Sequence, residues 1–230
     1  MTVLRVYLLL GMKTRIREHI ALNGSEAIAY GAIKAGVSFS ATYPMTPATP
    51  IFDTLVKYAQ EYTIAAKQAE DEISAVCMTI GASYAGVRSM TMTSGGGFSL
   101  MVEALGFTGI AEIPLVLVEA MRGGPSTGLP TKTEQSDLRF IVHASQGEFP
   151  RVVLAPGDVE ESFFETQRAF NLADMYQLPV IIPTARSIIS PFRAKALNSS
   201  KQVNPFAEIA VGFMFFRETE AIFFWNFSWP

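Results

Sequence analysis

Short apolar runs alternate with segments of helical period along most of this chain, and this alternation limits the possible folds more than any other feature. Regular alternation of strand and helix is typical of an α/β fold with a parallel central sheet and helices on both faces. The sequence therefore predicts that architecture for residues 23–183. The predicted strands are residues 37–43, 62–68, 87–93, 113–121, 151–156 and 178–182.

Capping residues mark where two of the helices begin. Asn23 is followed by Glu26 three residues later, which is typical of a capping box, and Gly36 suits the end of the same helix. Asp158 and Glu161 repeat the pattern before the last predicted helix. Both helices are therefore expected to begin at these polar residues.

The charge and cysteine content exclude several classes of protein. A net charge of −3 gives no basic stripe for nucleic acid or anionic lipid. Cys77 is the single cysteine, so this chain alone cannot supply the thiolates of an iron–sulfur cluster or a structural zinc site. The early apolar stretch at residues 6–12 is far shorter than the ~20 residues that span a bilayer. We expect a cytoplasmic protein that binds neither nucleic acid nor membrane.

The low charge content predicts a partner subunit. Charged residues make up 17% of the chain and apolar residues 49%, whereas the usual charged share is about 25%. A chain with so little charge is expected to hide more surface than a monomer of this size.

The two ends of the chain differ from its centre. Residues 1–22 read as an appended N-terminal extension. Residues 184–230 form an atypical tail that carries both tryptophans and lacks a clear helical or alternating period. Because exposed aromatic area promotes association, the tail is expected to pack on the domain or a partner, unless it is not the natural continuation of the chain.

The stretch TYPMTPATP, residues 42–50, follows a predicted strand and contains Pro44, Pro47 and Pro50. Fixed φ angles at three positions indicate one rigid backbone shape. Ligands of open α/β sheets bind at the carboxyl ends of the strands, so the turn is either a ligand contact through Thr46 or a stiff connector. After it, Thr49 is expected to cap a helix with Pro50 in the first helical position.

Three acidic residues, Glu70, Asp71 and Glu72, are predicted to lie in the first turn of the next helix. One acid there is expected, because the helix dipole favours negative charge at its N-terminus. Three exceed that need. If another subunit covers them, crowded carboxylates raise one another's pKa and one of them can retain a proton.

A long polar loop, residues 122–135, follows the most convincing buried strand, residues 113–121, and opens with Arg122. An arginine at the end of a buried strand suits bidentate recognition of a carboxylate or phosphate; the alternative is a flexible surface loop with a solvated arginine. The glycine cluster at residues 94–97 is read as a close-packing turn, because it matches neither dinucleotide nor P-loop patterns.

Six motifs, in order along residues 23–183, resemble the alpha subunit of 2-oxoacid:ferredoxin oxidoreductases, and most of all the 2-oxoglutarate type. The motifs are NGSEAIAYGAIKAG, YPMTPATPI, AEDEISAV, TSGGGFSLM, EAMRGGPSTGLPTKTEQSDL and LPVII. The resemblance implies the pyrimidine-binding domain of an enzyme whose thiamine diphosphate lies between two subunits.

The resemblance also implies roles for individual residues. Glu72 matches the glutamate that hydrogen-bonds the pyrimidine ring and promotes removal of the thiazolium C2 proton, and is the expected catalytic residue. Thr46 and Arg122 match the groups that bind the 2-oxoacid. The remaining expectations are Ser126 and Thr127 on the substrate or coenzyme A side, and Tyr43 and Pro44 beside the cofactor.

The implied partners supply what this chain lacks. A beta subunit would carry the diphosphate and Mg²⁺ site and an iron–sulfur cluster, and would pass electrons to ferredoxin while the acyl group passes to coenzyme A. A gamma subunit is a further possible partner, because many relatives carry a gamma-type domain at the N-terminal side.

Two alternatives remain open. Residues 184–230 show no resemblance to the further domains of the family, so the chain could be a truncated, non-catalytic interaction module of the same fold. It could also belong to the pyruvate, branched-chain or indolepyruvate class, which only a substrate assay separates.

Overall fold

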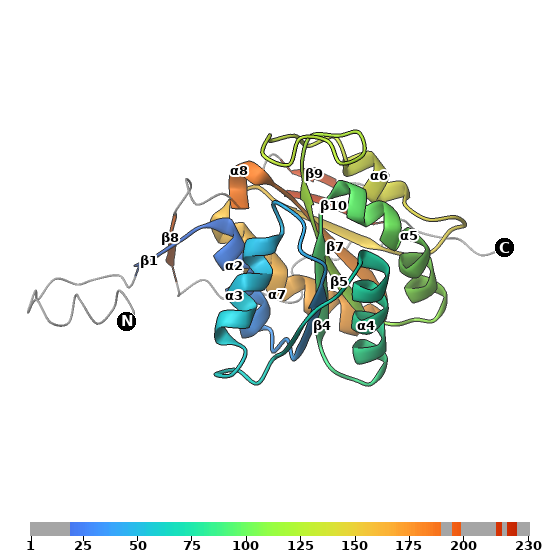
Figure 1. Ribbon diagram of the computed structural model, residues 1–230, viewed down its shortest axis with the longest axis horizontal. Coiled ribbons are helices and arrows are strands. Elements are labelled where there is room, and N and C mark those ends of the chain that lie inside the picture. Colours follow the sequence, from blue (N-terminus) through green and yellow to red (C-terminus); the bar gives the residue numbers. More distant parts are fainter. Residues whose placement is uncertain (1–18, 190–194, 199–214, 218–219, 225–230) are drawn as a thin grey trace, which may run out of the picture.

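A parallel six-stranded sheet forms the centre of the molecule, as the sequence predicts (Figure 1). The computed structural model describes residues 19–189, 195–198, 215–217 and 220–224. The parallel strands lie in the order β3-β2-β4-β5-β7-β6. Their bounds are Phe39–Thr42 for β2, Ala65–Gln68 for β3, Ser89–Thr93 for β4, Leu115–Met121 for β5, Val152–Pro156 for β6 and Pro179–Ala185 for β7.

Helices cover both faces of this sheet. One face carries α2 (Gly24–Lys34), α3 (Thr49–Tyr58) and α7 (Val159–Tyr176). The other carries α4 (Glu72–Tyr84), α5 (Gly95–Ile110) and α6 (Leu138–His143). A short helix, α8 (Arg186–Ile189), follows β7. In the described ranges, none of the helices combines the length and the apolar content that crossing a membrane requires.

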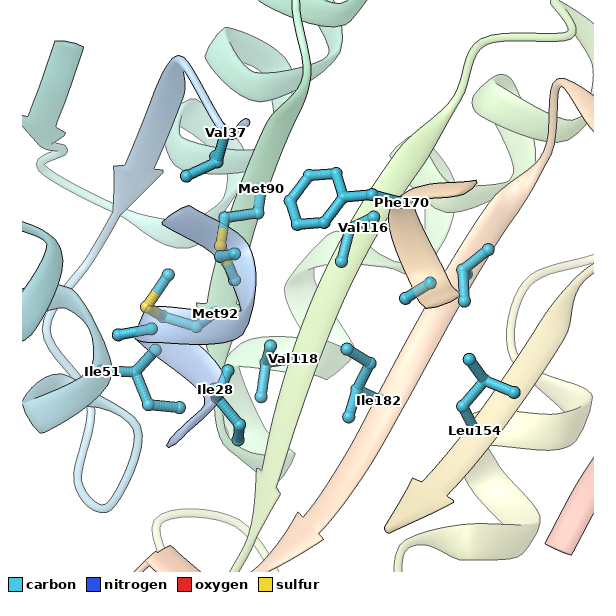
Figure 2. Close-up of a cluster of buried hydrophobic side chains, with 14 of the residues drawn as sticks. Ile28, Val37, Ile51, Met90, Met92, Val116, Val118, Leu154, Phe170 and Ile182 are labelled. Carbon is cyan, nitrogen blue, oxygen red and sulfur yellow. The ribbon is translucent and has the colours of Figure 1, made fainter. Parts of the chain in front are cut away.

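Two apolar cores form because successive strand residues point to opposite faces. Val116 and Val118 of β5 pack with α2 and α7 residues such as Ile28 and Phe170 (Figure 2). Leu115 and Leu117 of the same strand pack with α5 and α6 instead. All seven residues of β5 are buried, which agrees with its prediction as a buried strand.

The capping predictions are confirmed at one helix and modified at another. The Asn23 side chain accepts from Glu26 N at 3.0 Å, and Glu26 Oε2 accepts from Asn23 N at 3.0 Å. Asp158 likewise accepts from Glu161 N at 2.9 Å, but Glu161 Oε2 accepts from Gly157 N instead of closing a reciprocal box.

Two helix starts differ from the prediction. Ala48, not Thr49, is the N-cap residue of α3, because the backbone of the proline-rich turn is already coiled before Thr49. The glycines after Ser94 form the first turn of α5 instead of a separate turn. Glycine has low helix propensity, so their position inside a helix was not visible in the sequence.

Antiparallel pairs add to the parallel core. Strand β10 (Glu220–Phe224) pairs with β6, and β9 (Phe215–Arg217) pairs with β10. Strands β1 (His19–Leu22) and β8 (Lys195–Asn198) form a separate two-stranded ribbon. Most of the N-terminal extension and of the aromatic tail lies outside the described residues.

Candidate functional site

The predicted site residues follow the carboxyl ends of three parallel strands, and the first turn of α5 follows a fourth strand among them. The proline-rich turn follows β2, Glu72 follows β3, the first turn of α5 follows β4, and Arg122 follows β5. The carboxyl ends of parallel strands share one edge of the sheet, where ligands of open α/β folds bind. The topology therefore collects segments that are far apart in the sequence at one edge.

Glu72 is the first residue of α4 and is buried, with 4% of its surface exposed. Its Oε1 atom has no hydrogen-bond partner within the described part of the chain. A Cβ atom built at Gly97 would lie 2.6 Å from this oxygen, so the carboxyl group rests against the first turn of α5. A buried acceptor without a donor is costly, and the arrangement is suited to a ligand that supplies an N–H or O–H group.

The two acids next to Glu72, Asp71 and Glu70, have different surroundings. Asp71 is the N-cap of α4 and accepts from Ser74 N at 2.7 Å and from Ser74 Oγ at 2.9 Å. These bonds lower the pKa of Asp71 in the chain by itself; the raised pKa values are expected only for acids covered by another subunit. Glu70 is exposed and precedes the helix. The three acids therefore do not form one cluster within this chain.

Arg122 and Thr46, which the resemblance assigns to the same substrate, are brought together. Arg122 is 6% exposed and its Nη1 donates to the backbone carbonyl of Thr46 at 2.6 Å. Arg122 Nε is buried and has no partner among the described residues. The guanidinium group thus fixes the proline-rich turn and keeps one donor unused, while the Thr46 side chain lies at the surface.

The loop after β5 folds back over the first turn of α5 and lies at the top of Figure 1. A Cβ atom at Gly96 would lie 3.5 Å from Ser126 O. Leu129 N donates to Gly123 O at 2.7 Å, and this bond holds the two sides of the loop together near its start. Gly128 has φ +59°, and a side chain there would collide with Gly123 O, so this turn requires glycine.

The other predicted contacts are more peripheral. Tyr43 is 37% exposed and Pro44 is half-buried, both in the turn after β2. Ser126 and Thr127 are exposed in the loop after β5. Tyr43 and Pro44 thus lie in the turn to which Arg122 bonds, and Ser126 and Thr127 lie in the loop that follows Arg122.

Glu119 is a buried acid next to the site that the sequence did not indicate. It lies in β5, is completely buried, and in the described structure neither carboxyl oxygen accepts a hydrogen bond from a backbone, amide or hydroxyl group. Burial raises the pKa of Glu119 well above its ordinary value, and the charge of Asp137 raises it further. The available signal was the single acid within the otherwise apolar run LVLVEAM. Across residues that the structure describes, no group of three His, Cys, Asp or Glu side chains could hold a metal ion.

A family model described as pyruvate flavodoxin/ferredoxin oxidoreductase, thiamine diphosphate-binding, matches residues 30–206. The alpha subunit of 2-oxoacid:ferredoxin oxidoreductase 1 from Sulfurisphaera tokodaii is 48% identical over 177 residues, which cover 72% of this chain and 28% of that protein. The KorA subunit of 2-oxoglutarate synthase from Methanothermobacter thermautotrophicus is 46% identical over 165 residues, covering 72% of this chain and 44% of that one.

A solved structure is similar as well. It is 2-oxoglutarate:ferredoxin oxidoreductase from Magnetococcus marinus with 2-oxoglutarate, coenzyme A and succinyl-CoA bound. The TM-score is 0.71 at 44% sequence identity, over 72% of this chain and 29% of that one. The chain therefore spans less than half the length of these relatives.

Proposed function

Because the chain belongs to the family of thiamine diphosphate-binding domains of pyruvate flavodoxin/ferredoxin oxidoreductases, we propose that it is part of the alpha subunit of a 2-oxoacid:ferredoxin oxidoreductase. The complete enzyme converts a 2-oxoacid and coenzyme A to an acyl-CoA and carbon dioxide, and passes two electrons to ferredoxin. The substrate we propose is 2-oxoglutarate, in keeping with the KorA relatives and the 2-oxoglutarate bound in the similar structure.

The observation that carries this proposal is the unpartnered Oε1 atom of buried Glu72 at the carboxyl edge of the sheet. Thiamine diphosphate, when bound, supplies an electron sink for decarboxylation. The Glu72 carboxyl group fits the pyrimidine ring of this cofactor, because it could donate a proton to the ring nitrogen and then accept a hydrogen bond from the resulting N–H. Glu72 would hold or release a proton at that oxygen, in a pocket that excludes water.

The capping bonds at Asp71 prepare Glu72 for this task. Because Asp71 fixes the start of α4 through two bonds to Ser74, the backbone of Glu72 is set before any ligand arrives. Gly97 leaves room for the carboxyl group between α4 and α5. Such preorganisation lowers the cost of ordering a group at the moment of reaction.

Arg122 is the proposed binding group for the substrate carboxylate. Its buried guanidinium has an unused Nε donor, and a charge-assisted bond to a carboxylate is stronger in a site that excludes water. The Thr46 hydroxyl would contact the same substrate, held in place by the bond from Arg122 to the Thr46 carbonyl. Ser126 and Thr127 would line the side on which coenzyme A enters.

A beta subunit is the proposed partner, and the outer surface of α4 and α5 supports this. We call this surface the α4–α5 face; its exposed apolar residues are Ile73, Tyr84, Leu100, Phe107 and Ile110. Exposed apolar area gathered on one helix pair is typical of a protein interface. The beta subunit would supply the diphosphate and Mg²⁺ site and the iron–sulfur cluster, in a cytoplasmic complex that a gamma subunit could complete.

The alternative function is an interaction module of the same fold that binds the partner without completing an active site. The pyruvate, branched-chain and indolepyruvate classes remain the alternatives for the substrate.

Reconstitution tests the proposal. The full chain is combined with a beta-type subunit, purified as a complex, and supplied with thiamine diphosphate, Mg²⁺, 2-oxoglutarate and coenzyme A. We expect ferredoxin reduction that requires both 2-oxoglutarate and coenzyme A. A complex that binds the cofactor and contains iron, yet reduces no ferredoxin with any of the four 2-oxoacid classes, would leave the interaction module as the function.

A further inference from the structure

Glu119 is the most deeply buried acid near the candidate site, and the proposed reaction gives it no role. It is completely buried, and in the part of the chain that the structure describes neither of its oxygens accepts a hydrogen bond from a backbone, amide or hydroxyl group. An ionised carboxylate in such a position is costly, because nothing replaces its lost hydration. A neutral carboxyl group avoids that cost.

The sheet register places Glu119 on the face covered by α5 and α6. Leu115 and Leu117 of β5 pack on that face, and Glu119 continues the same alternation. In register, Glu119 lies between Thr93 of β4 and Pro183 of β7. Thr93 in turn lies against Gly97 in the first turn of α5.

A second carboxyl group approaches from the other end of the loop. Asp137 precedes α6, and its Oδ2 would lie 2.8 Å from a Cβ atom built at Gly95. The Asp137 carboxyl adds to the rise in the pKa of Glu119 that burial causes, and a hydrogen bond with Glu119 offsets part of the rise in the pKa of Asp137 that burial and Glu134 cause. The two acids therefore lie at the two ends of the loop 123–136, which carries Ser126 and Thr127.

The charged surroundings of Glu119 are few. Asp137 faces it from the start of α6 and Arg122 from the start of the loop. Glu134 acts on Asp137, whose pKa burial and Glu134 raise. The in-register neighbours from β4 and β7 are uncharged, and Glu72 of α4 lies against Gly97.

We propose that Glu119 is a positioning residue that remains a neutral acid and, by sharing one proton with Asp137, fixes the base of the loop 123–136 against the first turn of α5. This inference rests on the proposed function only in treating the loop as part of the substrate site. Loss of the shared proton leaves two like charges close together, one on the completely buried Glu119 and one on the half-buried Asp137, and their repulsion frees the loop.

The direction of the pH effect follows from the raised pKa of Glu119. The loop held against α5 favours the protonated form of Glu119. The stabilisation of the loop is therefore present at low pH and is lost as the pH rises through the raised pKa of Glu119. The Glu119→Gln substitution introduces an amide of similar shape that is neutral and cannot ionise. It is expected to hold the loop at every pH.

The test uses the full chain without cofactor or partner. Hydrogen exchange of the Leu129 amide, which bonds to Gly123 O, is compared at the same pH in wild type, Glu119→Gln and Glu103→Gln, an exposed acid of α5. At the alkaline end of the stable range we expect exchange in wild type to exceed that in Glu119→Gln by at least ~10-fold, the equivalent of one pKa unit. Glu103→Gln should follow wild type.

Infrared spectroscopy gives a second measurement that does not depend on loop motion. A protonated-carboxyl band at neutral pH is expected in wild type and in Glu103→Gln, and is expected to be missing in Glu119→Gln. The same band in all three proteins, or equal pH dependence of exchange in wild type and Glu119→Gln, would overturn the inference. Because neither readout requires turnover, failure of the reconstituted enzyme would contradict the proposed function alone.

Discussion

At the residue scale, the buried side chains of Glu72 and Arg122 each keep one polar atom, Oε1 and Nε, without a hydrogen-bond partner among the described residues. Polar atoms buried in this way reduce stability, so their presence at the carboxyl edge of the sheet indicates a ligand. We make a separate prediction for each group, because Glu72 is assigned to the cofactor and Arg122 to the substrate.

Glu72→Gln in the reconstituted complex is expected to slow exchange of the cofactor C2 proton by at least ~100-fold, the lower end of acid–base contributions. The amide keeps the shape of the side chain but cannot hold or release the proton. Exchange is followed by nuclear magnetic resonance after a pulse in deuterated buffer. Glu70→Gln is the matched control, since Glu70 is exposed two residues away; an unchanged rate in Glu72→Gln would remove Glu72 from the mechanism.

Arg122→Ala is expected to raise the KM for the 2-oxoacid by about 10-fold or more, since hydrogen bonds to charged groups contribute about 1.5–3 kcal/mol. Cofactor affinity should change little, because the proposed cofactor contact is Glu72. Initial rates and cofactor titrations separate the two effects. Arg139→Ala, which alters an exposed arginine of α6, should leave both unchanged, and a loss confined to cofactor affinity would contradict the role of Arg122.

At the element scale, the first turn of α5 connects the parts of the site. Gly97 lies against Glu72 and Thr93, Gly96 approaches Ser126, and Gly95 approaches Asp137. A helix that begins with three glycines is poor by propensity. Glycine is needed in this turn because α4, the loop after β5 and the start of α6 approach it too closely for a larger side chain.

Gly97→Ala is expected to destabilise the chain by about 1–3 kcal/mol, the usual cost of overpacking. The added Cβ would collide with Thr93 Oγ1 and the Glu72 carboxyl. Urea denaturation measures the free energy of unfolding. Gly81→Ala in α4 is the matched control, because a Cβ there meets nothing within 4 Å and helix propensity favours alanine by ~1 kcal/mol. Equal effects of the two changes would disprove the packing argument.

At the scale of the whole molecule, the α4–α5 face is the surface where we expect the beta subunit. Ile110 is 83% exposed and Tyr84 is 81% exposed. Both lie at the ends of their helices, away from the two buried cores. Their exposure agrees with the low charge content of the chain, which predicts a partner.

Ile110→Lys is expected to weaken binding of the beta subunit by at least ~10-fold, because desolvating a charge in an interface costs more than burying an apolar side chain gains. The thermal midpoint of the chain alone should stay the same. Titration calorimetry or biolayer interferometry measures the affinity. Tyr62→Lys, on the segment after α3 and 51% exposed, is the control; equal affinities of both variants and wild type would place the interface elsewhere.

The sequence by itself determined the parallel sheet, its two helical layers and the family. Apolar periodicity reports which face of each element is buried, and capping pairs such as Asn23 and Glu26 report on neighbours in the chain, so both are local information. The predicted approach of Arg122 to Thr46 follows from the resemblance, and the roles of all site residues remain predictions.

Only the tertiary structure decided what each polar group faces. It separated Glu72 from Asp71 and Glu70, moved the glycines after Ser94 into helix α5, and revealed Glu119 beside Asp137. Burial and pairing of a carboxyl group depend on strands and loops that are distant in the sequence. The free energy of an ionised group is set by those neighbours, and no local pattern contains them.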